Sequence, residues 1–276
     1  MTGRPVPLIV VGNEKGGSGK TTVAIHLVAG LAGAGLRVGA IDLDHRQRSF
    51  SHFFTNRAAW AERQGRAFAL PKLFAIEPSA REVRTLAEED DARRFAQAVA
   101  ELSAECDAIV VDCPGADTAL GRAAHGNAST IVTPLNDSFV DFDLLAGVDP
   151  ETFEAKAPAI YAEFVWESRK RHMIEKRRTI DWLVVRNRMS SMETRNQRRV
   201  SEALTKLAQR IGFRLAPGLS ERVIYRELFP KGLTVLDLIE GKSRGITMAQ
   251  VAARAEVRGL VAALRLPQLS KLAAAG

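Results

Sequence analysis

Residues 14 to 22 read Glu-Lys-Gly-Gly-Ser-Gly-Lys-Thr-Thr, a combination of side chains suited to holding phosphate. Gly16, Gly17 and Gly19 lack a Cβ, so the backbone can turn its N–H groups toward phosphate oxygens. Lys20 is placed to reach the β and γ phosphates of a nucleotide, and the Thr21 hydroxyl is placed to bind Mg²⁺. The predicted nucleotide-binding residues of this segment, called the phosphate loop below, are Glu14, Lys15, Gly16, Gly17, Ser18, Gly19, Lys20, Thr21 and Thr22.

The neighbouring residues supply the elements that must position this loop. The apolar run Leu8–Val11 has the length of a buried strand, and residues 21–34 carry a helical apolar pattern. A strand, a glycine-rich turn and a helix form the context that makes a phosphate loop credible. The positive end of the helix adds to the field around a bound phosphate.

Strand and helix patterns alternate along the rest of the chain. Further strands are predicted at residues 37–41, 108–111, 130–133 and 182–185. Further helices are predicted at residues 47–64, 80–104, 118–126, 157–178, 193–210 and 249–264. The alternation predicts an α/β fold, a doubly wound and mostly parallel sheet flanked by helices. Without a repeat or linker, we expect a single domain over residues 1–276, with a surface excursion at 240–249 and a tail at 266–276 that frays.

Composition sets broad limits on the class of protein. The 276 residues are 46% apolar, and no apolar run has the length of a membrane span or signal peptide. We therefore expect a cytoplasmic location and no membrane partner. Cys106 and Cys113 form no disulfide framework, and we expect reduced thiols near the core. His26 and His125 lack metal-ligand spacing, which favours packing roles.

Acidic residues follow two of the predicted strands. Asp42 and Asp44 end the strand at 37–41, and Asp112 ends the strand at 108–111. Because the carboxyl ends of parallel strands meet at one edge of a sheet, these carboxylates should lie beside the phosphate loop. There they can hold Mg²⁺, usually through water, or orient an attacking water. The alternative for any one of them is capping of a helix N-terminus.

Positive charge is concentrated in one region. Residues 169–210 contain 13 Lys and Arg against 4 Asp and Glu, a net +9, whereas the whole chain carries +7. On a helix over 193–211, four of these cations fall within about 60° of arc beside an apolar arc. This basic stripe consists of Arg195, Arg199, Lys206 and Arg210, with Arg198, Arg222 and Arg226 as possible extensions. It suits sequence-independent binding to a DNA phosphate backbone; the alternatives are a solvated helix face and an acidic protein partner.

Lys15 adds a resemblance to a known family. A lysine directly before the two glycines, with Glu14 where the common loop has glycine, resembles the deviant phosphate loop of the ParA/MinD ATPases. That resemblance implies ATP and Mg²⁺ as cofactors, with Lys15 crossing a dimer interface to the partner's nucleotide. It further implies that Asp44 positions the hydrolytic water and that Asp42 and Asp112 serve the metal's hydration shell. Asn187, after the strand at 182–185, matches a position that reads the adenine edge.

Longer strings resemble the MipZ branch of that family, the division-site regulators of alphaproteobacteria. They lie at residues 11–17, 132–143 and 223–230. The resemblance implies an ATP sandwich homodimer that binds nonspecific DNA, interacts with ParB and inhibits polymerisation of FtsZ. It also implies a nucleoid-associated location graded from the cell poles.

Other functions remain open on sequence alone. A chromosome- or plasmid-partitioning ParA would share the chemistry and differ in its partner. Phosphate loops also serve small-molecule phosphotransferases, but Lys15 argues against one. The presence of Lys20, Thr21, Asp44 and Asp112 argues against a DNA-binding scaffold with a vestigial site. An iron–sulfur reductase would need cluster cysteines, and the chain has only two.

Overall fold

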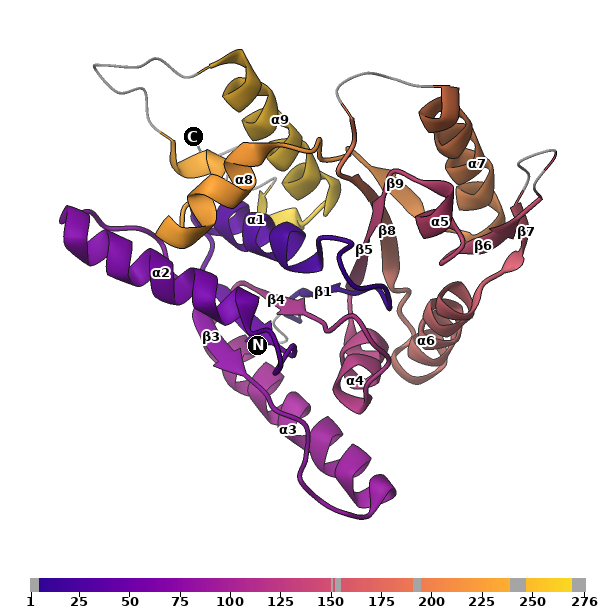
Figure 1. Cartoon of the computed structure of the whole chain (residues 1–276). Coiled ribbons are helices and arrows are strands. Elements are labelled where there is room, and N and C mark those ends of the chain that lie inside the picture. Colours follow the sequence, from indigo (N-terminus) through magenta and orange to yellow (C-terminus); the bar gives the residue numbers. More distant parts are fainter. Residues whose placement is uncertain (1–4, 150, 152–154, 191–194, 239–246, 270–276) are drawn as a thin grey trace.

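The computed structural model describes residues 5–149, 151, 155–190, 195–238 and 247–269. A seven-stranded sheet runs through the molecule in the order β3-β2-β4-β1-β5-β8-β9. All neighbouring strands in it are parallel, and helices cover both faces (Figure 1). The predicted doubly wound α/β fold is therefore confirmed.

The bounds of the elements follow the predicted alternation. The sheet consists of β1 (Leu8–Val11), β2 (Val38–Asp42), β3 (Lys72–Ala75), β4 (Ala108–Asp112), β5 (Thr130–Asn136), β8 (Asp181–Asn187) and β9 (Arg214–Ala216). A separate antiparallel pair is formed by β6 (Ala146–Val148) and β7 (Ala155–Pro158). The α-helices are α1 (Lys20–Gly33), α2 (Ser49–Gln64), α3 (Arg84–Glu105), α4 (Ala119–Asn127), α5 (Phe139–Phe142), α6 (Ile160–Lys176), α7 (Arg195–Ile211), α8 (Val223–Leu228) and α9 (Met248–Ala263). Short 3₁₀ turns lie at Phe229–Lys231 and Val235–Asp237.

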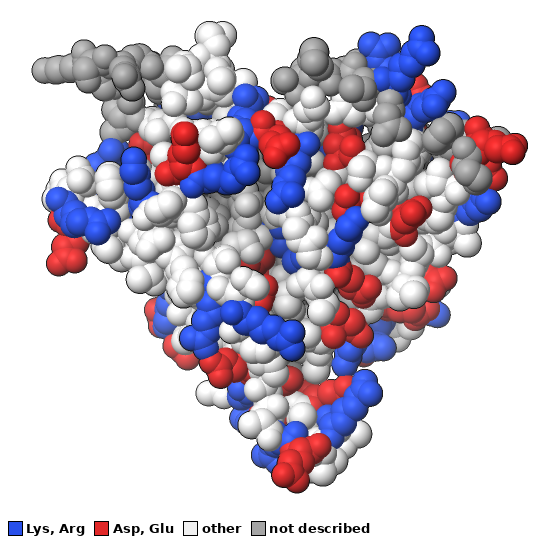
Figure 2. All heavy atoms as spheres, in the orientation of Figure 1, with Lys and Arg blue, Asp and Glu red and all other residues white. Residues whose placement is uncertain are grey.

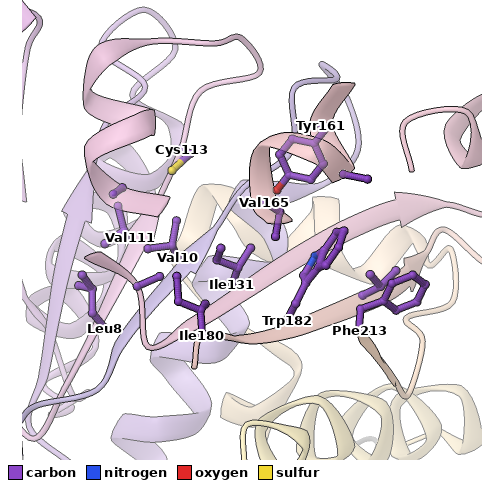
Figure 3. Close-up of a cluster of buried hydrophobic side chains, with 14 of the residues drawn as sticks. Leu8, Val10, Val111, Cys113, Ile131, Tyr161, Val165, Ile180, Trp182 and Phe213 are labelled. Atoms are coloured by element: carbon purple, nitrogen blue, oxygen red, sulfur yellow. The ribbon is translucent and has the colours of Figure 1, made fainter. Parts of the chain in front are cut away.

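Two apolar clusters hold the layers together, one on each face of the sheet. Successive side chains of β1 point to opposite faces, so Leu8 and Val10 join one cluster and Ile9 and Val11 the other. The first cluster packs beneath α3, α4, α6 and α7 (Figure 3). The second packs beneath α1, α2 and α9. The strands read as continuous apolar runs because both faces are buried.

The five predicted strands correspond to β1, β2, β4, β5 and β8; β1 has the predicted bounds, and the other four continue past the predicted carboxyl end. Asp112, Asn136 and Asn187 are the last residues of β4, β5 and β8, and the parallel pairing continues to them. The predicted helices at 47–64 and 80–104 begin instead at Ser49 and Arg84. The polar strand ends therefore form part of the sheet, which fixes their side chains beside the phosphate loop.

The C-terminal part of the chain lies against α1. As predicted, α9 is a docked helix whose apolar face, including Val257 and Leu260, belongs to the second cluster. Leu266 is buried and Leu269 packs partly against the same cluster, so the expected fraying from residue 266 is wrong for this stretch. The predicted excursion at 240–249 lies largely outside the described residues, as does the tail from 270.

Candidate functional site

The phosphate loop connects β1 to α1 at the carboxyl edge of the sheet. Gly17 and Gly19 have φ angles of 73° and 89°, in the left-handed region that glycine adopts without strain. A Cβ on Gly19 would also lie 2.0 Å from Nδ2 of Asn187. The left-handed backbone at Gly19 leads directly into Lys20, the first residue of α1. The N-terminus of a buried helix therefore points at the place where phosphate would bind.

Three asparagines brace this loop from the strand ends. Asn187 donates from Nδ2 to the Ser18 carbonyl over 2.9 Å, and Asn136 donates to the Gly17 carbonyl over 3.5 Å. Asn13 donates to the Pro134 carbonyl and accepts from the Lys15 N–H, each at a distance of 2.6 Å. Asn187 was predicted to read adenine, whereas Asn13 and Asn136 were not predicted as site residues. The only sequence signal for them was an amide side chain next to a predicted strand end.

Lys20 lies inside the loop. Its Nζ donates to the Lys15 carbonyl over 2.8 Å, and burial lowers the pKa of the ammonium group. A Cβ on Gly115 would lie 3.1 Å from Cα of Gly16 and 3.2 Å from Nζ of Lys20, so the chain after β4 rests directly on the loop. Because the ammonium is buried among backbone atoms, an anionic ligand at this point would be strongly favoured.

Asp112 and Thr21 form the part of the site that fits a metal ion. The Thr21 hydroxyl donates to Oδ2 of Asp112 over 2.7 Å. Oδ1 of Asp112 is buried without a hydrogen-bond partner, and burial raises the pKa of this carboxyl to about 8. An unpartnered carboxyl oxygen beside a threonine hydroxyl is a donor set that Mg²⁺ accepts, directly or through water, once the cation displaces the carboxyl proton. Among the described residues no group of three or more His, Cys, Asp or Glu could hold a metal on its own.

The two carboxylates after β2 differ in their surroundings. Oδ1 of Asp42 accepts the Asp44 N–H over 3.0 Å, and Oδ2 accepts the N–H and hydroxyl of Ser51 over 2.9 and 2.6 Å. Oδ2 of Asp42 thus stabilises the first turn of α2, in line with the capping alternative raised from the sequence, whereas Oδ1 bonds within the turn that precedes this helix. Asp44 is half-buried, and among the described residues its carboxylate accepts only the Gln47 N–H, at 3.1 Å. Asp44 is therefore the more available of the two for a water or a metal's hydration shell.

Lys15 is held within its own chain. Its Nζ lies 3.1 Å from Oδ1 of Asp141, and it donates to the Val140 carbonyl over 3.4 Å. The lysine side chain is 36% exposed, whereas that of Asp141 is 6% exposed and also accepts from the Ser138 hydroxyl. No local sequence pattern predicts this contact, because the two partners lie far apart in the chain. Lys15 therefore lies at the mouth of the loop, paired but accessible.

The predicted basic stripe is exposed on α7. Val200, Ala203, Leu204 and Leu207 are buried, which confirms the predicted apolar arc. Basic side chains gather at the upper right of the molecule, where α7 lies (Figures 1 and 2). The exposed cations of this helix are Arg195, Arg198, Arg199, Lys206 and Arg210.

Three of the arginines predicted to contact DNA either bind other groups of the protein or lie on another helix. Arg210 donates to the carbonyls of Ala155 and Lys156 in β7, over 2.5 and 3.1 Å. Arg222 pairs with Glu256 of α9 over 2.6 Å, and Arg226 is exposed on α8. Since α8 contributes to the cluster on the other face of the sheet, Arg222 and Arg226 do not extend the stripe within one subunit.

His26, His125 and the two cysteines pack in the core. Nδ1 of His26 contacts the Thr22 carbonyl and Nδ1 of His125 the Gly121 carbonyl, over 2.7 and 2.8 Å. Cys106 and Cys113 are free and buried, as expected. Burial lowers the pKa of His125 to about 4, so its ring is neutral near pH 7.

We expect His125 to make folding stability depend on pH. The unfolded chain binds the histidine proton below its ordinary pKa of 6.5, whereas the folded chain binds it only near 4. The contribution of His125 to the free energy of unfolding is therefore complete above pH 6.5 and is lost as the pH falls from 6.5 toward about 4. From about pH 7 to about pH 5 the loss is about 2 kcal/mol. Denaturant unfolding of wild type and His125→Gln at both pH values measures this loss. The carboxylates are common to both proteins, so the difference between their changes in unfolding free energy isolates His125. Equal changes in the two proteins would contradict the assignment.

Comparisons with known proteins come from three sources. The family model described as ATPase MipZ matches residues 7–268. A chromosome partitioning protein ParA from Myxococcus xanthus is 28% identical over 145 residues, which are 46% of this chain and 51% of the relative. A tetraacyldisaccharide 4'-kinase from Neisseria gonorrhoeae is 43% identical over 61 residues, 22% of this chain and 18% of the relative. The chain thus spans about half or less of the length of these curated relatives.

Solved structures share the fold at low sequence identity. An apo structure of McdA from Cyanothece superposes with a TM-score of 0.65 at 19% identity, covering 94% of this chain and 99% of that chain. MinD from Pyrococcus horikoshii with Mg-ADP gives a TM-score of 0.55 at 17% identity, covering 95% and 99%. Within the described ranges, no helix combines the length and apolar character that a membrane crossing requires.

Proposed function

This chain belongs to the MipZ family of ATPases, and from that premise we propose that it hydrolyses ATP with Mg²⁺ at the phosphate loop. The observation that carries the proposal is the buried Lys20 ammonium beside Asp112, whose Oδ1 has no hydrogen-bond partner. Mg²⁺, when bound, would neutralise developing charge on the β and γ phosphates. The loop N–H groups and Lys20 bind the phosphates, while Thr21 and Asp112 would hold the metal or its waters. Asp44 orients the attacking water.

Dimerisation follows from the position of Lys15. Its ammonium lies at the mouth of the loop on a side chain that is 36% exposed, held by Asp141 of α5. Val140, next to Asp141, is an exposed apolar side chain at 72%. We expect two ATP-bound subunits to meet across this surface, with Lys15 of each reaching the phosphates of the other. The γ-phosphate then forms part of the interface, so that ATP controls the oligomeric state.

The exposed cations of α7 support DNA binding by the dimer. Arginine and lysine on one helix face suit contacts to backbone phosphates, which carry no sequence information. One subunit would hold few phosphates, and two subunits on one duplex roughly double the exponent of the salt dependence. DNA binding should therefore require ATP and be indifferent to sequence.

Removing two of these cations tests the stripe. We expect Arg195→Ala with Arg199→Ala to weaken binding to all duplexes alike and to flatten the salt slope by roughly one unit per lost phosphate contact. A salt titration of duplex binding with ATP measures both quantities. Arg63→Ala with Arg66→Ala is the matched control, because it removes two exposed cations around the end of α2. A double α7 variant with the wild-type slope and affinity would assign the stripe to solvent or to a protein partner.

The cellular role we propose is division-site placement. As a MipZ-family ATPase, the dimer would inhibit FtsZ polymerisation, and ParB would supply subunits from the cell poles and set up a graded, nucleoid-associated distribution. FtsZ polymerisation with and without this protein and ATP tests the role directly. The partial match to a partitioning ParA favours chromosome or plasmid segregation as the second candidate. Unchanged FtsZ polymers together with ATP-dependent binding to ParB would support that candidate instead.

A further inference from the structure

Tyr161 contacts the chain at the point where it leaves β1 for the phosphate loop. It lies in the first turn of α6 and is 1% exposed. Its hydroxyl donates to the Gly12 carbonyl over 2.8 Å. The two residues are separated by 149 positions in the sequence. A side chain from a distant helix is therefore fixed to the peptide between Gly12 and Asn13, just before the loop.

Two more side chains make this contact the end of a hydrogen-bond chain. Nε1 of Trp182 donates to Oγ1 of Thr133 over 3.0 Å, and Oγ1 lies 3.1 Å from the Tyr161 hydroxyl. An indole N–H can only donate and a carbonyl can only accept. Since the Tyr161 proton goes to the Gly12 carbonyl, the Thr133 proton goes to Tyr161. The chain runs in one direction, from Trp182 through Thr133 and Tyr161 to Gly12. Such chains polarise and strengthen each bond.

His125 lies against the same hydroxyl but cannot replace it. Because Nδ1 contacts the Gly121 carbonyl over 2.8 Å, Nδ1 carries the ring proton. The neutral ring then leaves Nε2 without a proton, 3.3 Å from the Tyr161 hydroxyl. A Cβ on Gly12 would lie 2.3 Å from Nε2, so the imidazole packs tightly against this peptide. The buried surroundings of Gly12 thus combine one donor, Tyr161, with a ring that has no proton to offer there.

We propose that Tyr161 is a positioning residue for nucleotide binding, which acts by fixing the peptide of Gly12 and thereby the N–H groups of the phosphate loop. Trp182 on β8 and Thr133 on β5 hold the Tyr161 hydroxyl in place. Tyr161 and Trp182 belong to the buried cluster and are labelled in Figure 3, and Thr133 is fully buried. The inference rests on the proposed nucleotide binding at the loop. It requires neither a dimer nor DNA.

The substitution Tyr161→Phe removes the hydroxyl and keeps the ring. We expect the Kd for Mg-ADP, measured with a fluorescent ADP analogue, to rise roughly five- to tenfold, the range of one lost hydrogen bond. Thr133→Val should raise this Kd by less, because Tyr161 keeps its hydrogen bond to Gly12 and loses only the one that it accepts from Thr133. Tyr225→Phe is the matched control, since the chain has two tyrosines and Tyr225 donates to Glu256 over 3.4 Å. Its Kd should stay within about twofold of wild type.

A second readout separates positioning from packing. Thermal unfolding without nucleotide reports any general loss of stability in Tyr161→Phe and Thr133→Val. A lower Tm with an unchanged Kd would overturn the inference, as would a rise in Kd in Tyr225→Phe equal to that in Tyr161→Phe. If Tyr161→Phe fails to fold, the Kd of Thr133→Val decides alone. Absence of ADP binding in the wild-type protein would instead overturn the proposed function itself.

Discussion

Lys15→Ala should remain monomeric in the presence of ATP while still binding the nucleotide. Lys20 and the loop N–H groups, which hold the phosphates within one subunit, are untouched by this change. The crossing ammonium is lost, and the partner's phosphates are left without it in a desolvated interface. Truncating one member of such a pair costs about 2–5 kcal/mol, so the dimer Kd should rise roughly 30-fold or more. Size-exclusion chromatography with light scattering measures the dimer, and a fluorescent ATP analogue measures binding.

Asp141→Asn is the control for this variant. In the structure Lys15 pairs with Asp141 of its own chain over 3.1 Å. If the role of Lys15 were only to hold Asp141, Asp141→Asn would abolish the dimer as Lys15→Ala does. We expect Asp141→Asn to dimerise with ATP, because Lys15 is still present and is released from its cis partner. A normal ATP dimer of Lys15→Ala would refute the crossing role.

Asp44→Ala should bind ATP and dimerise but turn over roughly 10²-fold more slowly than wild type, since it removes the residue that we propose to orient the attacking water. The variant would accumulate as the ATP dimer. Phosphate release measures turnover, and size-exclusion chromatography measures the trapped dimer. Asp117→Ala is the control, because it removes an exposed carboxylate from the neighbouring loop, where it pairs with Arg122.

Asp42 provides the internal comparison. Its Oδ2 accepts two hydrogen bonds from Ser51 in the first turn of α2 and its Oδ1 accepts the Asp44 N–H, so Asp42→Ala should lower thermal stability along with activity. Asp44→Ala should leave the Tm nearly unchanged. Wild-type turnover in Asp44→Ala would move the hydrolytic role to another residue.

The core of the fold and the phosphate loop could be predicted because their signals are local. Apolar runs such as Leu8–Val11 mark strands buried on both faces, and glycine–lysine spacing lies within one short segment. The strands that were missed lack such runs. In β3 (Lys72–Ala75) no residue is buried, and β9 (Arg214–Ala216) has three residues and lies at the sheet edge. An edge strand of this kind forms because the neighbouring strand offers backbone hydrogen bonds. The local sequence carries no sign of that neighbour.

The side chains that support the phosphate loop could not be predicted either, because no local pattern records contacts between distant parts of the chain. Asp141, Asn136 and Tyr161 reach the loop region from 119 or more residues away. Only the folded sheet brings them to the loop. Arg222 shows the reverse case, since a charge counted toward DNA binding from sequence is engaged by Glu256.

The ion pair between Lys15 and Asp141 has a consequence for the timing of assembly. Lys15 must leave Asp141 before it can reach a second subunit, so association would contain a unimolecular release step. The observed association rate would then stop rising with protein concentration and level off at the release rate. Asp141 is almost completely enclosed, at 6% exposure, and its separation from the lysine leaves a carboxylate without its counter-charge. The lifetime of a single ion pair would thereby set an upper limit on how quickly a population of monomers can respond to ATP.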